Sequence, residues 1–369
     1  MKNVFDITDF GAAENIECTK AIQAAVDAAA QVKGAVIIPP GKYLCGNIRL
    51  KPSVSLIGSH GWGYRETGGS TLVLSDKNAR CMVDMTDAFG ACVKGIQFNG
   101  NGLKGSNIHG VMLDRKIYNG GRFAEDEKDE NPLLEPTHAD FREDNFVIAD
   151  CQVKNFSGDG IHLNKIFAFT VCDCQIMSNG GDGIYVNGWD GWIHDCIIHT
   201  NNGAGIGSAR EKSICSSITV TGNRIEWNKS GGVRIINGDS LTVNNNFFDR
   251  CGGAAVSLKA DRRGAVRDIT VVGNIFRRSG KPNFGGFNDK YDSSHVYLKH
   301  CENVVVSSNV CRLGVDDGGS GTASPDYSVV GIGVKNCVIT NNAMSGGFIK
   351  KPIVTDETCE NNIIKDNIH

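Results

Sequence analysis

The sequence predicts an all-β fold, a parallel β-helix in which a solenoid of roughly ten coils forms one domain over residues 1–369. The first observation is an internal repeat that carries Cys, and later Asn, at one equivalent position. These positions are Cys151, Cys174, Cys196, Asn223, Asn246, Asn274, Asn309, Asn342 and Asn362. The second observation is a series of short β-rich runs, from GVML near Gly110 to GIGV near Val334. No helical periodicity separates the runs, so the repeating unit consists of strands and turns.

One coil of roughly 22 residues accommodates three short strands with turns between them. When coils stack at about 4.8 Å, equivalent residues lie directly above one another. We therefore expect the repeated cysteines and asparagines to form an internal ladder, in which side-chain amides hydrogen-bond from coil to coil. The longer spacings, such as the interval between Asn274 and Asn309, mark loops inserted into single coils.

Both ends of a β-helix expose sheet that needs a cap. The segment CTKAIQAAVDAAAQ, within an N-terminal cap of about residues 1–50, has apolar residues at helical spacing and Thr19 as its expected N-cap. The apolar positions are Ile22, Ala25, Val26 and Ala29. We expect this helix to close the first coil. The C-terminal CENNIIKDNIH has no comparable helix, so a short loop or another subunit would cover that end.

Composition excludes several classes of partner. The net charge is −3 and charged residues make up 21% of the chain, so no basic face indicates nucleic acid and no polybasic run indicates anionic lipid. No apolar stretch is long enough to span a membrane. An oligo- or polysaccharide remains the expected partner. The start KNVFDITDFGAA lacks the apolar run of a secretory signal, which predicts a cytoplasmic location, or a secreted one if a signal peptide has been removed.

The 14 cysteines lack the paired spacing of a zinc site, since Cys172 and Cys174 form only a CxC. In a long chain without a visible signal, cysteines are expected to stay reduced and to serve as small buried apolar groups. The sequence therefore predicts no metal site and no cofactor.

The motif DFGA, the amphipathic helix and then GAVIIPPGKYLCGNIRLKPSVSLIGS resemble the N-terminal module of the pectate-lyase-like superfamily of single-stranded right-handed β-helix proteins. The motif covers about residues 5–60, and the repeat pattern covers most of the remainder. The resemblance implies a right-handed β-helix whose outer face holds a glycan. That superfamily includes polysaccharide lyases, polygalacturonase-type hydrolases, fructotransferases, epimerases and phage tailspikes, so the resemblance implies no single reaction.

Strand alternation predicts which side chains leave the solenoid. If aliphatic positions such as Ile161 and Leu163 point inward, the alternate positions of successive coils point outward. These outward positions are His162, Tyr185, Gly207, Arg234 and Ser257. Their polar character predicts a long shallow track on which successive sugar rings lie.

Two carboxylates occupy the same place in neighbouring coils, Asp159 and Asp182, just before the strand. Two acids about one coil apart suffice for glycosidic chemistry, because one protonates the leaving oxygen while the other attacks or activates water. The alternative is structural, since Asp before Gly often accepts backbone N–H groups in turns.

Asp190 lies between Trp189 and Trp192, which predicts a third acid beside a platform for a sugar face. Alternatively, the indoles pack under a neighbouring loop. The succession of Asp182 and Asp190 is also similar to the acids around a DG-plus-strand in the inulin fructotransferases, although the surrounding residues diverge. Residues 180–196 are thus the predicted catalytic and sugar-stacking centre.

Charged residues flank the predicted track. Glu211 lies in a loop after one aligned strand, and Arg234, Lys259 and Arg262 would neutralise the carboxylate of a uronic acid. A solvated charged loop is the alternative for the DRR segment. The charged insertion of about residues 114–144 is expected to be a solvated loop, or to fold over one end of the track. On another face, Glu226 beside Trp227 is a reserve acid.

These residues favour a carbohydrate-active enzyme that hydrolyses or transfers glycosidic bonds through Asp182 with Asp159 or Asp190. One alternative is a lyase that uses His162 and Tyr185 as base and acid in β-elimination. Another is a non-catalytic glycan-binding or phage-fibre-like β-helix. A homotrimer is compatible with each of these functions.

Overall fold

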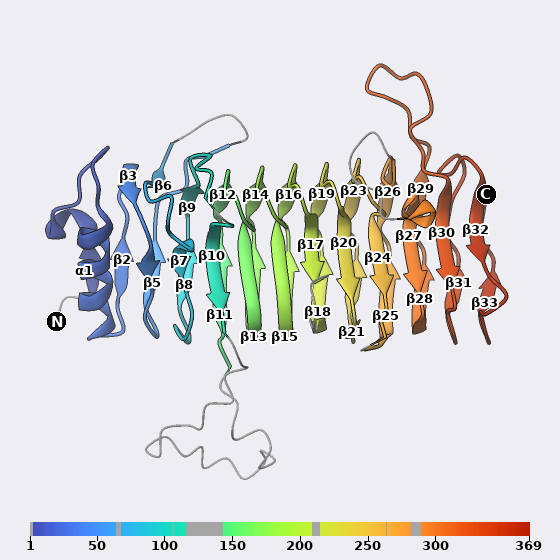
Figure 1. Cartoon of the computed structure of the whole chain (residues 1–369), viewed down its shortest axis with the longest axis horizontal. Coiled ribbons are helices and arrows are strands. Elements are labelled where there is room, and N and C mark those ends of the chain that lie inside the picture. Colours follow the sequence, from blue (N-terminus) through green and yellow to red (C-terminus); the bar gives the residue numbers. More distant parts are fainter. Residues whose placement is uncertain are drawn as a thin grey trace, which may run out of the picture.

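A computed structural model describes residues 3–63, 68–105, 107–115, 143–208, 215–262, 264–281 and 289–369. It is a parallel β-helix, as predicted, with its coils stacked along one long axis from the N-terminal helix to the last strands (Figure 1). Each coil contributes to three rows of strands, because one sheet has 23 strands in two rows and a second sheet has ten. Among the described residues, no helix is long and apolar enough to cross a membrane.

The first row of the large sheet carries the predicted track. Its strands are β4 (Ile48–Arg49), β7 (Cys81–Asp84), β10 (His109–Asp114), β17 (Ala204–Ser208), β20 (Gly231–Ile236), β24 (Val256–Lys259), β27 (Ser294–Lys299), β30 (Tyr327–Ile332) and β32 (Lys351–Thr355). Two longer strands, β13 (Ile161–Cys172) and β15 (Ile184–His194), belong to both the first and the second row.

The second row follows the first along the chain in most coils. Its strands are β1 (Val4–Asp6), β2 (Ala35–Ile37), β5 (Ser55–Ile57), β8 (Cys92–Lys94), β11 (Phe146–Ala149), β18 (Cys215–Thr221), β21 (Gly238–Asp239), β22 (Thr242–Asn244), β25 (Val266–Val272), β28 (Cys301–Ser307), β31 (Val338–Thr340) and β33 (Ile363–Lys365). A short 3-10 turn, η3 (Lys290–Asp292), precedes strand β27 of the first row.

The ten-stranded sheet, here called the short-strand sheet, forms one long edge of the solenoid (Figure 1). Its strands are β3 (Gly41–Cys45), β6 (Ser70–Leu74), β9 (Ile96–Asn99), β12 (Gln152–Lys154), β14 (Gln175–Met177), β16 (Ile197–His199), β19 (Arg224–Glu226), β23 (Phe247–Asp249), β26 (Ile275–Arg277) and β29 (Val310–Arg312). In the three-residue strands the middle residue is buried, so the first and third side chains face outward.

From β13 to β28, the chain bends near the start of the second row, and the backbone at this bend explains its residue types. In register from coil to coil, the bend residue has a positive φ in the left-handed region. These residues are Ala168, Asp190, Ser217, Ser240, Asp268 and Asn303. Short polar residues tolerate this conformation better than bulky ones, so the column is mostly Asp, Asn and Ser.

The predicted internal ladder is present, but its last asparagine is Asn367 and not the predicted Asn362. Asn342 Nδ2 donates to Asn367 Oδ1, whereas Asn362 Oδ1 accepts the N–H of Cys337. Asn223 Nδ2 donates to Asn246 Oδ1 at 3.0 Å, and Asn246 Nδ2 donates to Asn274 Oδ1 at 3.1 Å. A second ladder, which the sequence analysis did not identify, joins Asn179, Asn201 and Asn228 at the next turn. All 14 cysteines are free thiols, and most of them are buried.

The N-terminal helix α1 (Thr19–Ala30) lies over the first coil and buries its four predicted apolar residues (Figure 1). A short 3-10 turn, η1 (Ile7–Phe10), packs against it. The predicted N-cap was wrong, because the cap residue is Cys18 and it makes no side-chain cap. Thr19 Oγ1 instead accepts the N–H of Gly46, which ties the helix to the first coil.

Candidate functional site

The predicted outward column exists in the first row. His162 pairs with Tyr185, Tyr185 with Gly207, Gly207 with Arg234, and Arg234 with Ser257. The prediction that this column is open to solvent was wrong, because His162 is only 8% exposed, Tyr185 4% and Ser257 3%. Stacking of rings contributes to this burial. The His162 ring lies 4.8 Å from that of Tyr185 and 4.2 Å from that of His109.

Asp159 is fully buried, which corrects the prediction that it faces solvent on the outer wall. Its Oδ1 accepts the backbone N–H of Asp182 at 2.8 Å, so it caps the turn of the next coil. Its Oδ2 lies 2.7 Å from His162 Nδ1 and 3.4 Å from His109 Nδ1. The turn-capping alternative therefore holds for Asp159, which also orients His162.

The tautomers of the two histidines follow from these partners. The N–H of Asp159 can only donate, so His109 Nδ1 accepts it, at 3.0 Å. The carboxylate accepts, so His162 Nδ1 carries the proton and Nε2 is left as the basic nitrogen of the ring. His109, Asp159 and His162 are the group that could hold a metal ion among the described residues, with ligand atoms within 4.8 Å of one another. Both Nδ1 atoms are already hydrogen-bonded, so the group is organised as a hydrogen-bond network.

Asp182 lies at the entrance to β15 and is half-buried. Its Oδ1 accepts the N–H of Ala204 at 2.7 Å, which repeats the capping contact of Asp159 one coil later. Its Oδ2 lies beside Gly207, where an added Cβ would overlap it. The carboxylate therefore takes the side-chain place of Gly207, between Tyr185 and Arg234 in the outward column.

The structure does not bring Asp190 to this place. Asp182 precedes the first arm of β15, whereas Asp190 occupies the bend before the second arm, with φ 54°. Trp189 packs edge-on against Phe167, with ring centroids 6.4 Å apart, and Trp192 is 53% exposed beyond the bend. The predicted single centre at residues 180–196 is thus divided between two rows of strands.

The flanking charges have separate positions. Lys259 Nζ lies 3.0 Å from Asp292 and 3.6 Å from Asp289, so protein carboxylates already neutralise this predicted substrate cation. Arg234 is half-buried in the column, and Arg262 is exposed. Glu211 and most of the charged insertion, residues 116–142, lie outside the described residues.

Asp114 is an acid beside the column that the sequence analysis missed. Asn164 Nδ2 donates to Asp114 Oδ1 at 2.7 Å, and Asn187 Nδ2 donates to Asn164 Oδ1 at 2.7 Å. Burial acts to raise the pKa of Asp114, but the hydrogen bond from Asn164 and the charges of His162 and Arg80 hold it below its usual value. Alternation two residues beyond His162 and Tyr185 would have predicted this second outward column.

A second site lies on the short-strand sheet. An open groove of about 530 Å³ runs over its outer face at β14, β16 and β19. It is lined by Gln175, Ile197, His199, Thr200, Arg224, Glu226 and Trp227. Of these residues, only Glu226, beside Trp227, was predicted to have a part in chemistry, as a reserve acid. Burial and the nearby charge of Arg224 lower the pKa of His199, so this imidazole is neutral at pH 7.

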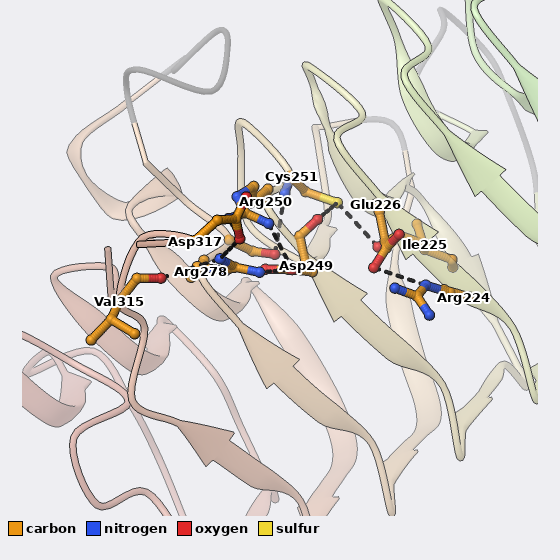
Figure 2. A network of polar contacts seen from close by, with 10 residues as sticks. Arg224, Ile225, Glu226, Asp249, Arg250, Cys251, Arg278, Val315 and Asp317 are labelled. Atoms are coloured by element: carbon orange, nitrogen blue, oxygen red, sulfur yellow. Dashed lines mark hydrogen bonds and ion pairs between the residues drawn. The ribbon is translucent and has the colours of Figure 1, made fainter. Parts of the chain in front are cut away.

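A network of ion pairs supports one side of this groove (Figure 2). Glu226 Oε1 lies 2.9 Å from Arg224 Nε. In the next coil, Asp249 accepts a hydrogen bond of 2.7 Å from Arg278 Nε and another of 3.2 Å from Arg250 Nη1. The guanidinium of Arg250 also lies over the indole of Trp227, 4.5 Å from the ring centroid.

The turn that carries Trp227 has an unusual backbone. Trp227, Arg250 and Arg278 have φ of 57°, 51° and 53° at equivalent positions in three neighbouring coils. Earlier coils use Asn155, Ser178 and Thr200 at this place. A bulky side chain in the left-handed region costs roughly 1–2 kcal/mol, so these three positions carry larger side chains than the turn conformation favours.

Comparison with known families gives one match over more than half of the chain. The family described as "Right handed beta helix region" matches residues 159–369. This range begins at the buried Asp159 and includes the outward column from His162 onward.

Solved structures of similar fold cover the whole length. DFA-IIIase from Arthrobacter chlorophenolicus A6 in complex with GF2 superposes with a TM-score of 0.67 at 12% identity, covering 100% of this chain and 98% of that one. The A-module of Azotobacter vinelandii mannuronan C-5 epimerase AlgE4 gives 0.53 at 16% identity, covering 98% of each chain. The tailspike of E. coli bacteriophage HK620 in complex with a pentasaccharide gives 0.64 at 12% identity, covering 99% of this chain and 65% of the tailspike. At these identities the similarity is one of fold.

Proposed function

The chain belongs to the right-handed β-helix family, as its N-terminal motif predicted, and from that premise we propose that it is a carbohydrate-active enzyme. It cleaves or transfers glycosidic bonds of an oligo- or polysaccharide at the first-row column. The descriptions of the three similar structures support a saccharide as the ligand class, because they name a mannuronan epimerase and complexes with GF2 and a pentasaccharide.

The position of the Asp182 carboxylate carries this proposal. A carboxylate that replaces the side chain of Gly207 lies within the outward column, where a sugar that follows the track would meet it. From the place of Gly207, His162 lies two coils before, held by Asp159, and Arg234 lies one coil after. An acid, an oriented imidazole and a cation thus occur within four successive coils of one face.

The reaction uses these groups in separate roles. Asp182, in its protonated form, donates a proton to the glycosidic oxygen as the bond to the leaving sugar breaks. The Nε2 atom of His162 takes the proton of the attacking water, or of an acceptor sugar hydroxyl in transfer. Asp159 is a positioning residue, because it fixes the imidazole tautomer and has no access to solvent.

One observation favours β-elimination on uronic acids as a second candidate. The His162 and Tyr185 rings stack at 4.8 Å, and Arg234 follows two coils after Tyr185. Such a reaction uses a base for the C5 proton, an acid for the leaving oxygen and a cation for the sugar carboxylate. These three residues would fill those roles.

The test is a panel of neutral and uronate oligosaccharides, incubated with the parent protein and with Asp182→Asn. The asparagine retains an oxygen for the N–H of Ala204, so the variant is expected to keep its melting temperature and to lose at least about 10²-fold in turnover. Hydrolysis gives new reducing ends, transfer gives new linkages, and elimination gives an unsaturated product that absorbs in the ultraviolet. Full activity of Asp182→Asn would contradict the role of Asp182 as the acid. Binding of an oligosaccharide without any product would indicate a non-catalytic glycan-binding protein.

A further inference from the structure

We propose that the groove on the short-strand sheet is a second saccharide site, separate from the first-row column, and that it binds a neutral sugar stacked on Trp227. The site is an open groove with a volume of about 530 Å³. This volume lies within the range of about 300–1,000 Å³ of small-molecule sites in proteins.

Trp227 is the residue that a sugar face would contact. Its side chain lines the groove and remains 42% exposed, although tryptophan is usually more buried than this in folded proteins. Arg250 lies against its indole at 4.5 Å and holds the ring in place. An immobilised aromatic ring of this kind provides contact area without the entropy cost of ordering a mobile side chain.

Polar groups for sugar hydroxyls surround the indole. Gln175 and Thr200 line the same groove with Arg224 and Glu226, so both donors and acceptors are present. Glu226 is held by its ion pair with Arg224 at 2.9 Å. A few fixed polar groups around an aromatic surface are the usual composition of a ligand site.

The charge balance selects a neutral sugar over a uronate. Arg224 and Glu226 cancel each other, and the neutral imidazole of His199 adds no charge. Behind them, Arg250 and Arg278 are paired with Asp249 and Asp317 (Figure 2). None of these described cations is left to neutralise a sugar carboxylate, and Glu226 would repel one.

The left-handed turn provides an independent observation. Side chains at this turn leave the solenoid beside the third residue of each short strand, and three coils place Trp and Arg where other coils place Asn, Ser or Thr. Two of these large side chains, Trp227 and Arg250, pack on each other at the groove.

The experiment is isothermal titration of the full chain with cellohexaose, laminarihexaose, maltohexaose and tetragalacturonate. The Asp182→Asn background keeps the sugars intact during the titration. We expect at least one neutral hexaose to bind more tightly than tetragalacturonate. Trp227→Ala should weaken that binding at least tenfold, and Trp227→Tyr should restore most of it.

Trp192→Ala is the matched control, because Trp192 is an indole on another row of strands that is somewhat more exposed than Trp227, at 53% against 42%. It should bind the hexaose as the parent does, within twofold. Glu226→Gln keeps the size of the lining residue and should relax the discrimination against tetragalacturonate. If Trp227→Ala fails to fold, the Trp227→Tyr and Glu226→Gln pair still tests the site.

The proposal is overturned if Trp227→Ala binds as the parent does, if the loss occurs in Trp192→Ala instead, or if no neutral hexaose binds at millimolar concentration. These outcomes are independent of catalysis. An inactive protein that binds sugars through Trp227 would contradict only the proposed function. An active protein whose sugar binding does not depend on Trp227 would contradict only this inference.

Discussion

Asp159 has a different partner for each of its carboxylate oxygens, so its two roles can be separated by mutation. In Asp159→Asn, Oδ1 can still accept the N–H of Asp182, but the amide cannot hold His162 in the same tautomer. We expect turnover to fall by roughly 10²–10⁴-fold, because an imidazole in the wrong tautomer is a poor base. The pH profile should change with it, which a purely structural role would not cause.

Asp159→Ala removes the cap as well. The N–H of Asp182 then loses its acceptor in a buried turn, and the free energy of unfolding should fall by about 1–3 kcal/mol below that of Asp159→Asn. Urea unfolding monitored by circular dichroism gives this difference. Equal stability of the two variants would contradict the capping role, and normal turnover in Asp159→Asn would contradict the positioning role.

At the residue scale, the sequence could predict register but not exposure. The equivalence of Asp159 with Asp182, and of His162 with Tyr185, follows from the spacing of the repeat. The burial of Asp159 depends on His109, which lies 50 residues earlier and comes near it only when the coils stack. The role of Gly207 as the space for a carboxylate also required coordinates.

At the scale of the element, the left-handed backbone of the bend explains why an aspartate occupies position 190. We expect Asp190→Asn to keep both activity and stability, because Asn tolerates a φ of 54° as well as Asp does. Asp190→Val should lose about 1–2 kcal/mol of stability with its catalytic constants unchanged, since a β-branched residue is strained in that region. Turnover assays and thermal unfolding of both variants check this. A large loss of turnover in Asp190→Asn would instead indicate that Asp190 is catalytic.

The asparagine ladder is the second element whose contribution can be measured. Asn246 is buried and exchanges hydrogen bonds with Asn223 and Asn274, and its amide also donates to the carbonyl of Val220 at 2.9 Å. Asn246→Ala leaves these groups without partners, so we expect a loss of about 3 kcal/mol in urea unfolding. Asn202→Ala, at an exposed asparagine, is the control and should change stability by less than about 0.5 kcal/mol. Equal effects of the two substitutions would mean that the ladder adds no stability.

The same elements explain why only part of the site could be predicted from the sequence. Cys and Asn recur at one place in the coils from Cys151 onward, so most of the ladder could be predicted from spacing alone. The bend could not, because Ala168, Asp190 and Ser217 share a backbone angle and not a residue type. Because the bend was not predicted, Asp182 and Asp190 were expected in one centre at residues 180–196.

At the scale of the whole molecule, stacking places two different surfaces on one solenoid. The first-row column and the short-strand groove belong to separate sheets, and each gathers residues from several coils. The sequence analysis concentrated on the first because its Gly-led runs are regular. The groove depends on Arg224, Trp227 and Arg250, whose positions in three-residue strands and turns have too short a pattern to predict.

The whole solenoid should also lose stability at alkaline pH, because its core contains buried thiols. Burial raises the pKa of Cys215, Cys251 and Cys311 to about 12, from the ordinary value of 9.0. For such a group the folded state favours the thiol, so its contribution is fully present below pH 9 and is lost as the pH rises from there toward 12. Below pH 9 these three groups should produce no pH dependence.

At pH 10 the unfolded chain is already mostly ionised at these positions while the folded core is not. Each of these three thiols then costs about 1.4 kcal/mol, so the loss is at least about 4 kcal/mol, because burial also raises the pKa of Cys45, Cys81 and Cys301. Urea unfolding in reductant at pH 8 and pH 10 measures this loss. Cys251→Ala has its own cavity cost at both pH values, but its loss between pH 8 and pH 10 should be smaller by about 1.4 kcal/mol. An unchanged free energy of unfolding at pH 10 would mean that the thiols ionise as easily in the folded chain as in the unfolded one, and thus that the stacked core admits water.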